Sequence, residues 1–192
     1  MSADAGLITR YLLDWRAGDA SALERLTSAV YTELRRLAAA VLNSRAGFDT
    51  IQPTELVHEL YFELPSLQQI DFASRAHFLN LTAHVMRTIL IDHARKRMAA
   101  RRGGQAVTLR FDSRVTDRAL QADVLAVNEA LDRFAEKFPR QAKVVELRFF
   151  GGLTAEETTA ALSVSGYETS LRSVGRDWNF AKAWLQNAIA SR

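Results

Sequence analysis

Residues 154–185 read TAEETTAALSVSGYETSLRSVGRDWNFAKAWL, and this stretch decides how the C-terminal part of the chain folds. Thr154 and Glu157 have the spacing of a capping box, which predicts a short helix from here to Leu162. After a polar turn, a second helix is predicted from about Ser170 to Ala190. Its apolar residues recur at spacings of 4, 3 and 4 and so form one stripe: Val174, Trp178, Ala181 and Leu185.

This order of a short helix, a turn and a longer helix is typical of a helix-turn-helix. Polar residues near the start of the longer helix would be free to enter a major groove, where arginine reads guanine and cations contact phosphates. The expected DNA contacts are Arg172, Ser173, Arg176 and Lys182. An ordinary amphipathic helical hairpin is the alternative explanation of the same pattern.

Helical periodicity continues through the rest of the chain, which contains only three prolines and nine glycines. A capping box at Ser21 and Glu24 is expected to open a helix whose apolar stripe consists of Leu23, Leu26, Val30, Leu34, Leu37 and Val41. Pro53 suits the first turn of a further helix, which Pro65 ends. The remaining helices are expected over about 4–16, 75–101, 121–137 and 140–150. The fold class is therefore expected to be all-α.

A break divides these helices into two groups. Gly103 and Gly104 interrupt the long helix, and residues 103–120 show no sustained apolar stripe. We therefore expect two small helical domains, residues 1–102 and 121–192, joined by a flexible linker over 103–120. The C-terminal domain would be the helix-turn-helix.

Positive charge is concentrated at the end of the first group. No acidic residue occurs from His93 to Phe111, whereas this span contains Arg95, Lys96, Arg97, Arg101, Arg102 and Arg110. Such a cluster suits a polyphosphate partner, even though the net charge of the 192-residue chain is only +3. The alternative is a solvated helix end whose cations lie near the negative pole of the helix dipole.

The residues argue against several other classes of protein. The chain has no cysteine, which excludes disulfides and thiolate metal sites. No signal peptide and no run of 18 apolar residues is visible, which indicates a cytoplasmic protein without a membrane partner. His77 and His84 share a helix face, but no metal-binding motif surrounds them. Because phosphate-binding loops and nucleophile motifs are also missing, we expect no enzyme, no catalytic residue, no metal and no cofactor.

Several longer motifs follow one another along the chain. They are LDWRAGD at 13–19, PTELVHELY at 53–61, DHARKR at 92–97, VELRFFGGLTAEE at 145–157 and AKAWL at 181–185. In this order and at these separations they resemble the extracytoplasmic function (ECF) sigma factors of bacterial RNA polymerase, over nearly the full length of the chain. The resemblance implies a transcription initiation factor with no catalytic activity of its own.

The resemblance also implies a division of labour. In that family, region 2 binds core RNA polymerase and the −10 promoter element, while region 4 binds the −35 element. Residues 1–102 would be region 2 and residues 121–192 region 4. Glu55, Leu56 and Glu59 would then face the β and β′ subunits of the polymerase, and the four polar residues of the second C-terminal helix would meet −35 DNA.

The −10 element is read partly as single-stranded DNA, which requires cations for the backbone and aromatic surfaces for the bases. The residues implied in this contact are Phe72, Phe78, Asn80, Arg87, Arg95, Lys96, Arg97, Arg101 and Arg102. For Phe78 a place in the core is the alternative role.

The chain departs from the family pattern at 52–55, which is usually rich in acids. Gln52 and Thr54 stand where carboxylates are usual, so weaker polymerase binding is expected. A phosphate on Thr54 would add roughly −1.5 to −2 charges near a helix N-terminus, where anions are favoured. We therefore expect a Ser/Thr protein kinase to act on Thr54, with Thr50 as a second candidate. A simple capping role for Thr54 and control by an anti-sigma factor are the alternatives.

A second departure lies between the two C-terminal helices. The family usually passes from a Leu-Gly-Val-Ser segment straight into the recognition helix, whereas residues 163–169 here imply an insertion in the turn. Gly175 also replaces a frequent basic residue and weakens the helix by about 1 kcal/mol relative to Ala. Both features are expected to change the affinity or the sequence preference for the −35 element.

Two other functions fit part of these observations. A helix-turn-helix repressor or activator would bind duplex DNA without core polymerase. A helical adaptor would use the basic cluster to bind acidic proteins. A stoichiometric complex with core polymerase distinguishes a sigma factor from both.

Overall fold

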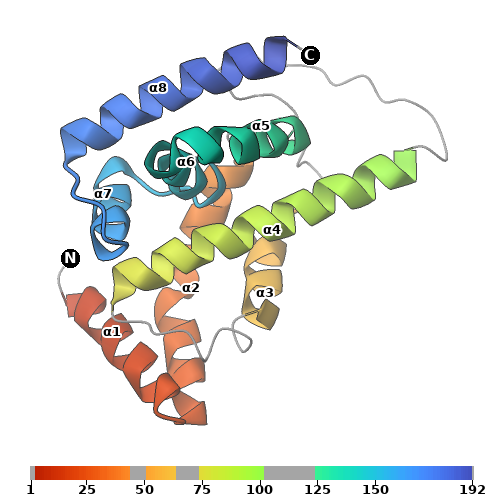
Figure 1. Cartoon of the computed structure of the whole chain (residues 1–192). Helices are drawn as coiled ribbons and strands as arrows, with labels where there is room; N and C mark the ends of the chain where they lie inside the picture. The colour runs from red at the N-terminus through yellow and green to blue at the C-terminus, as the bar shows by residue number, and fades with distance from the viewer. Residues whose placement is uncertain (1–2, 44–50, 64–73, 102–123, 192) are drawn as a thin grey trace.

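The computed structural model describes residues 3–43, 51–63, 74–101 and 124–191, which form helices joined by short turns (Figure 1). The elements are α1 (Ala3–Arg16), α2 (Ala20–Asn43), α3 (Pro53–Glu63), α4 (Arg75–Arg101), α5 (Val124–Lys137), α6 (Pro139–Val145), the π-helical turn η3 (Glu146–Phe150), α7 (Ala155–Val164) and α8 (Leu171–Ala190). These ranges contain no strand, which confirms the all-α prediction. The expected linker over 103–120 lies outside them, and the division into two domains stays a prediction.

Helix starts follow local capping chemistry. The Asp19 carboxylate accepts a hydrogen bond from the Ser21 backbone N–H at 2.9 Å. Because this cap starts α2 at Ala20, the predicted capping box at Ser21 and Glu24 is wrong. Hydrogen bonds from the Ser21 and Arg25 side chains lower the pKa of Asp19 to about 2.

The predicted capping box at Thr154 is confirmed. The Thr154 hydroxyl accepts from the Glu157 N–H, and the Glu157 carboxylate accepts from the Thr154 N–H. A second box, which the sequence reading missed, opens α8, because the Ser170 and Ser173 hydroxyls each accept from the other residue's N–H. Both helices of the expected helix-turn-helix therefore begin at residues that satisfy their own backbone donors.

The N-terminal half, residues 3–101 of the described chain, places α1, α2 and α3 along one side of the long helix α4 (Figure 1). Its largest fully buried side chains are Leu12, Leu26, Leu34, Leu37, Leu56, Leu60, Phe78 and Leu79. Full burial of a leucine or phenylalanine side chain contributes about 1.5–3 kcal/mol. This core therefore fixes the orientation of α4, the element that carries the implied −10 contacts.

The C-terminal half, residues 124–191, covers the other side of α4 with α5, α6, α7 and α8 (Figure 1). Aromatic side chains join α5 to α8, since the Phe134 ring centroid lies 4.9 Å from that of Trp184 and 5.9 Å from that of Phe180. These separations are typical of stacked and tilted aromatic pairs. The packing holds α8 as a rigid outer helix.

The two halves pack directly against each other at the turn that follows η3. A Cβ added to Gly151 would lie 2.5 Å from the Ala83 Cβ of α4. Gly152 has φ +66°, and a Cβ there would lie 2.7 Å from the Leu37 carbonyl oxygen of α2. Only glycine fits such a close approach without strain. The buried apolar residues of both halves accordingly form one continuous core.

Candidate nucleic-acid and polymerase interfaces

Four polar residues of α4 recur at spacings of 3, 4 and 3 and therefore lie on one face of the helix: His77, Asn80, His84 and Arg87. We call them the α4 stripe. Its first two members contact the end of α7. The His77 Nε2 lies 3.1 Å from the Val164 carbonyl oxygen, and the Asn80 Nδ2 donates to the Ser165 Oγ at 2.6 Å. The stripe thus starts against the turn of the expected helix-turn-helix.

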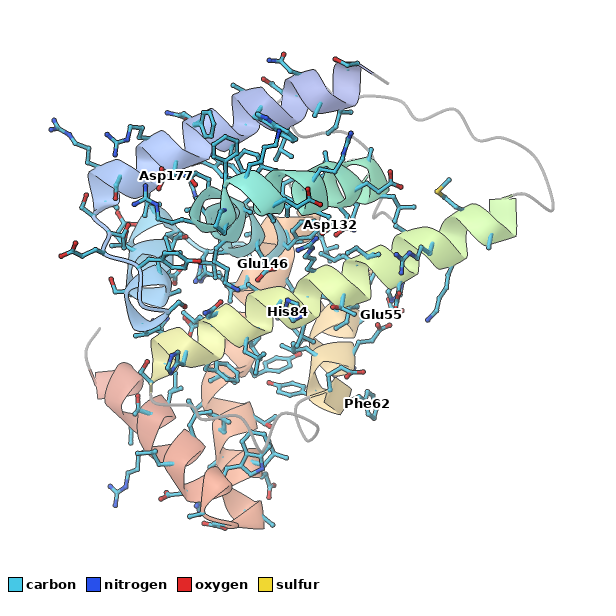
Figure 2. All side chains as sticks on the ribbon, in the orientation of Figure 1. Glu55, Phe62, His84, Asp132, Glu146 and Asp177 are labelled. Atoms are coloured by element: carbon cyan, nitrogen blue, oxygen red, sulfur yellow. The ribbon has the colours of Figure 1, made fainter. Side chains whose placement is uncertain are left out.

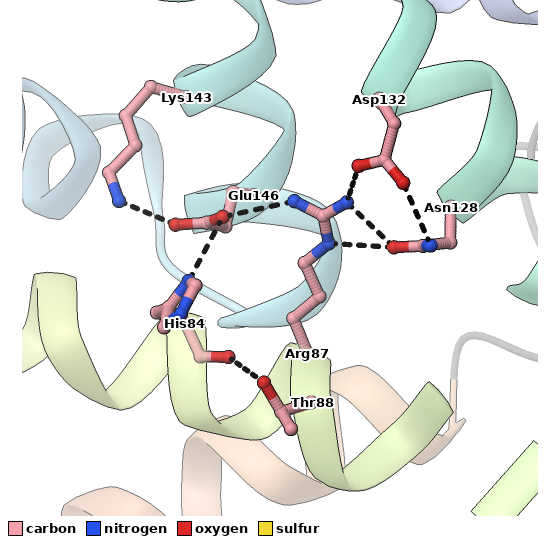
Figure 3. Close-up of polar contacts among 7 residues, drawn as sticks. All are labelled: His84, Arg87, Thr88, Asn128, Asp132, Lys143 and Glu146. Atoms are coloured by element: carbon pink, nitrogen blue, oxygen red, sulfur yellow. Dashed lines mark hydrogen bonds and ion pairs between the residues drawn. The ribbon is translucent and has the colours of Figure 1, made fainter. Parts of the chain in front are cut away.

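Arg87 is bound by three residues of the C-terminal half (Figure 3). Its Nε and Nη2 donate to the Asn128 Oδ1 at 2.8 and 2.6 Å. The Nη2 also donates to the Asp132 Oδ1 at 2.5 Å, and the Nη1 to the Glu146 Oε2 at 3.3 Å. Since the Arg87 side chain is only 17% exposed, these contacts occupy most of the directions in which its guanidinium can donate.

Glu146 is the most enclosed carboxylate of this cluster. It belongs to η3, is 7% exposed, and accepts from the Lys143 Nζ at 2.5 Å. The His84 Nδ1 lies 3.5 Å from its Oε2 (Figure 3). Burial alone would raise the pKa of Glu146, but the hydrogen bond to His84 and the charge of Lys143 outweigh it and lower the pKa to about 2. Glu146 is therefore ionised and binds cations from both halves.

A second ionic cluster joins the halves at the start of α4. Arg75 pairs with Glu33 of α2, and its Nη2 lies 3.7 Å from the Glu157 Oε1 of α7. Arg36 of α2 donates to the same Glu157 oxygen at 2.6 Å. Charged contacts of this kind are typical of interfaces between parts of a chain that can separate.

The helix-turn-helix presents a different surface. Arg172 and Arg176, two of the predicted −35 contacts, are exposed in the first turns of α8. Ser173 is half-buried and serves the capping box, so its hydroxyl is bonded within the chain. The Lys182 Nζ lies 5.6 Å from the centre of the Trp178 ring, a cation–π distance. The two arginines are thus the predicted residues that α8 offers most openly.

Asp177 holds α8 in place from below (Figure 2). Its carboxylate is 4% exposed and accepts hydrogen bonds from the Arg140 Nη2 at 2.9 Å and the Gln141 Nε2 at 3.2 Å. The Arg148 guanidinium lies 4.5 Å from the centre of the Trp178 ring. The angle of α8 therefore rests on paired polar groups of α6 as well as on apolar packing.

The predicted polymerase contacts on α3 differ in exposure. Glu55 is exposed, and the Glu59 Oε1 lies 2.6 Å from the His93 Nε2 of α4. Leu56 is fully buried, so its side chain packs inside the N-terminal half. Phe62, near the end of the same helix, is 82% exposed and points away from the molecule (Figure 2). The sequence reading did not single out this phenylalanine.

The remaining predicted residues fall into two groups. Arg95 and Lys96 are exposed near the end of α4, and Phe78 is 1% exposed in the core. Thr54 is half-buried in the first turn of α3. Thr50, Phe72 and Arg102, together with the side chains of Arg97 and Arg101, lie outside the described residues.

Sequence reasoning missed the acceptors that engage Arg87 and the pairing of Asp177. One signal was present for Asp177, because it is a charged residue between Val174 and Trp178 on an otherwise apolar stripe. Asn128 and Asp132 sit four residues apart on the polar side of α5 and carry no such signal. Their partner is 41 residues away, which no local pattern reports.

Comparison with known proteins adds the family. The model of the ECF sigma factor family matches residues 6–191. No curated protein and no solved structure matches the chain. Among the described residues, no helix has the length and apolar character that crossing a bilayer requires. Since the family model spans almost the whole chain, this protein belongs to the ECF sigma factors.

Proposed function

We propose that this protein is an alternative sigma factor that binds core RNA polymerase and directs transcription initiation at specific promoters. Residues 1–102 would bind the polymerase and the −10 element, and residues 121–192 the −35 element. The observation that carries the proposal is the family match over residues 6–191, together with a capped α8 that exposes Arg172 and Arg176. Exposed arginines at the start of such a helix suit guanine and phosphate contacts in a major groove.

The polymerase contact is proposed on α3. Exposed Glu55 and Phe62 supply a charge and an apolar anchor on one helix, and Glu59 is half-buried beside His93. Anchors that combine an aromatic residue with peripheral charges are typical of protein interfaces. Because Leu56 is buried, its part in the contact is to hold α3 in position.

The deciding experiment mixes purified protein with core polymerase from the same cells and analyses the mixture by size-exclusion chromatography. A sigma factor gives a stoichiometric complex, which then initiates at discrete sites on genomic DNA. A regulator that acts without polymerase would bind duplex DNA alone and give no complex. The matched control is Glu55→Gln with Phe62→Ser, which should weaken the complex at least tenfold while leaving the helical fold unchanged.

We further propose that phosphorylation of Thr54 strengthens polymerase binding. Thr54 lies in the first turn of α3, next to Glu55, where a phosphate would meet the positive end of the helix dipole. Gln52, which also replaces a usual acid, is exposed just before it. Thr50 is the second candidate, and an anti-sigma factor is the alternative regulator.

This part of the proposal is tested in cells with Thr54→Ala and Thr54→Ser. Alanine should abolish promoter activation, whereas serine keeps an acceptor hydroxyl and should retain it. Phosphate on the wild-type residue is then sought by mass spectrometry. Equal activation by the alanine and serine variants contradicts a role for phosphorylation at this residue.

A further inference from the structure

The α4 stripe is bound along its whole length by the C-terminal half. His77 and Asn80 contact the end of α7, His84 contacts η3, and Arg87 contacts both η3 and α5. Two of these residues, Asn80 and Arg87, are among the residues proposed to meet the −10 strand. In the arrangement described here, protein occupies the groups that DNA would need.

The acceptors around Arg87 have the chemistry of a nucleic-acid backbone. A carboxylate and a phosphate present similar paired oxygens to a guanidinium, and each satisfies the same donors. Asp132 and Glu146 hold Nη2 and Nη1 at 2.5 and 3.3 Å. A phosphate or a base edge can reach these nitrogens only after the carboxylates have left them.

The cluster has one firm and one loose side. Glu146 is 7% exposed and bound to Lys143, so its removal from Arg87 requires η3 to move. Asp132 is 63% exposed, and ion pairs that open to water are weak. An interface held partly by such contacts can separate, unlike a core that is apolar throughout.

Distance gives an independent reason for separation. The −10 and −35 elements are centred about 25 base pairs apart, which is roughly 85 Å of duplex at 3.4 Å per base pair. The longest element of the chain, the 27-residue α4, is only about 40 Å long at 1.5 Å per residue. Since α8 packs over α5 and α6 on the side of α4, the closed molecule cannot reach both elements at once.

We infer that the closed arrangement is an autoinhibited state, in which Asn128, Asp132, Glu146 and the turn after α7 mask the α4 stripe until the C-terminal half moves away. The inference rests on the proposed sigma-factor function. It assigns to the acidic residues of α5 and η3 a regulatory role, in which they compete with promoter DNA for Arg87. Core polymerase would complete the opening by holding the two halves apart.

A reversible lock tests this directly. His84 of α4 and Lys143 of α6 converge on the Glu146 carboxylate from opposite halves, at 3.5 and 2.5 Å. Because the chain has no cysteine, His84→Cys with Lys143→Cys creates the only two thiols. A short bis-maleimide linker with a reducible bond then ties the halves together, and a reductant releases them.

The locked protein should lose at least tenfold in initiation on genomic DNA with core polymerase, and reduction should restore it. The control carries the same linker within α8, between Gln186→Cys and Ala190→Cys, which are both exposed, and should initiate equally before and after reduction. Equal initiation by the locked and released interhalf proteins would overturn the inference while leaving the sigma-factor function intact. If wild type itself neither binds polymerase nor initiates, the proposed function fails, and the inference falls with it.

A variant without crosslinks gives a second measurement. Asp132→Asn keeps the size of the side chain and removes the charge that faces Arg87. Free protein with this change should bind a random-sequence single-stranded DNA at least threefold more tightly by fluorescence anisotropy. Adding Arg87→Ala should remove that gain. Unchanged binding by Asp132→Asn would contradict masking of Arg87 by this carboxylate.

Discussion

The two DNA-facing surfaces proposed for this protein differ in what they contact. On α8, Arg172 and Arg176 are exposed to solvent, whereas on α4, Asn80 and Arg87 are bonded to the other half of the chain. Both surfaces consist of residue types that bind nucleic acids. The difference teaches that packing between the halves, rather than residue type, decides which surface is available in the free protein.

The difference has a physical cause in the two helices themselves. α8 is an outer helix that buries one side and is capped by Ser170, so its first turns need no further partner. α4 lies between the two halves, and its polar residues would be buried without partners unless the opposite half supplied them. Variants that loosen α8 or free α4 therefore affect the two surfaces differently.

The largest effect is expected from Asp177→Ala, which removes the support of α8. Arg140 and Gln141 would lose their shared acceptor in a site where the carboxylate is 4% exposed. Breaking a buried pair of this kind lowers the free energy of unfolding by about 3 kcal/mol. Urea unfolding measures the loss, and Asp177→Asn, which keeps an acceptor oxygen, should lose clearly less. Equal losses would mean that the hydrogen bonds to Asp177 do not position α8.

Acid should weaken the masked surface of α4 next. The pKa of Glu146 is lowered from 4.5 to about 2, so its stabilising contribution is fully present above pH 4.5 and is lost as the pH falls towards 2. The expected loss over this window is on the order of 2–3 kcal/mol. Urea unfolding at a series of pH values measures it. Glu146→Gln should flatten this part of the curve, and a variant curve parallel to wild type would contradict the assignment.

Gly152→Ala should separate the halves while sparing α8. The residue has φ +66°, and the new Cβ would lie 2.7 Å from the Leu37 carbonyl oxygen. Strain and overpacking together are expected to cost about 2 kcal/mol in the free energy of unfolding. Hydrogen exchange should rise at the contact between α2 and η3. In the control Gly175→Ala the Cβ meets nothing within 4 Å, so this variant should be neutral or up to about 1 kcal/mol more stable.

The smallest effect is expected at the start of α7. Thr154→Ala removes the hydroxyl that accepts from the Glu157 N–H at 3.2 Å, and the loss of such a cap costs about 1 kcal/mol. Thr154→Ser retains the oxygen and should stay close to wild type in thermal unfolding. A serine variant as unstable as the alanine variant would show that the methyl group, and not the cap, matters here.

Much of the fold could be predicted from local chemistry. Both ends of α4 were expected at Arg75 and Arg101 and are found there, because helical periodicity and flanking turns are local signals. The capping box at Thr154 was predicted for the same reason. The start of α2 was misplaced, because Asp19 and Ser21 are both good caps, and only the structure shows which of them accepts from the backbone.

The site could be predicted only in part. Arg87, Arg172 and Arg176 were picked for their charge, but sequence gave no means to see that Arg87 is 17% exposed and bound by residues at 128, 132 and 146. An apolar stripe reports which side of a helix is buried and not which helix covers it. His77 and His84 were expected to share a face, and their partners in α7 and η3 became visible only in three dimensions.

The central claim is that this protein is a sigma factor whose halves are closed when free and separate on core polymerase. The most direct measurement places spin labels at Ser28→Cys on α2 and Gln186→Cys on α8, both exposed, in a chain that has no other thiol. Double electron–electron resonance should give one narrow distance distribution for the free protein. Stoichiometric core polymerase should shift it by tens of ångströms to longer distances. A distribution that polymerase leaves unchanged would contradict the account.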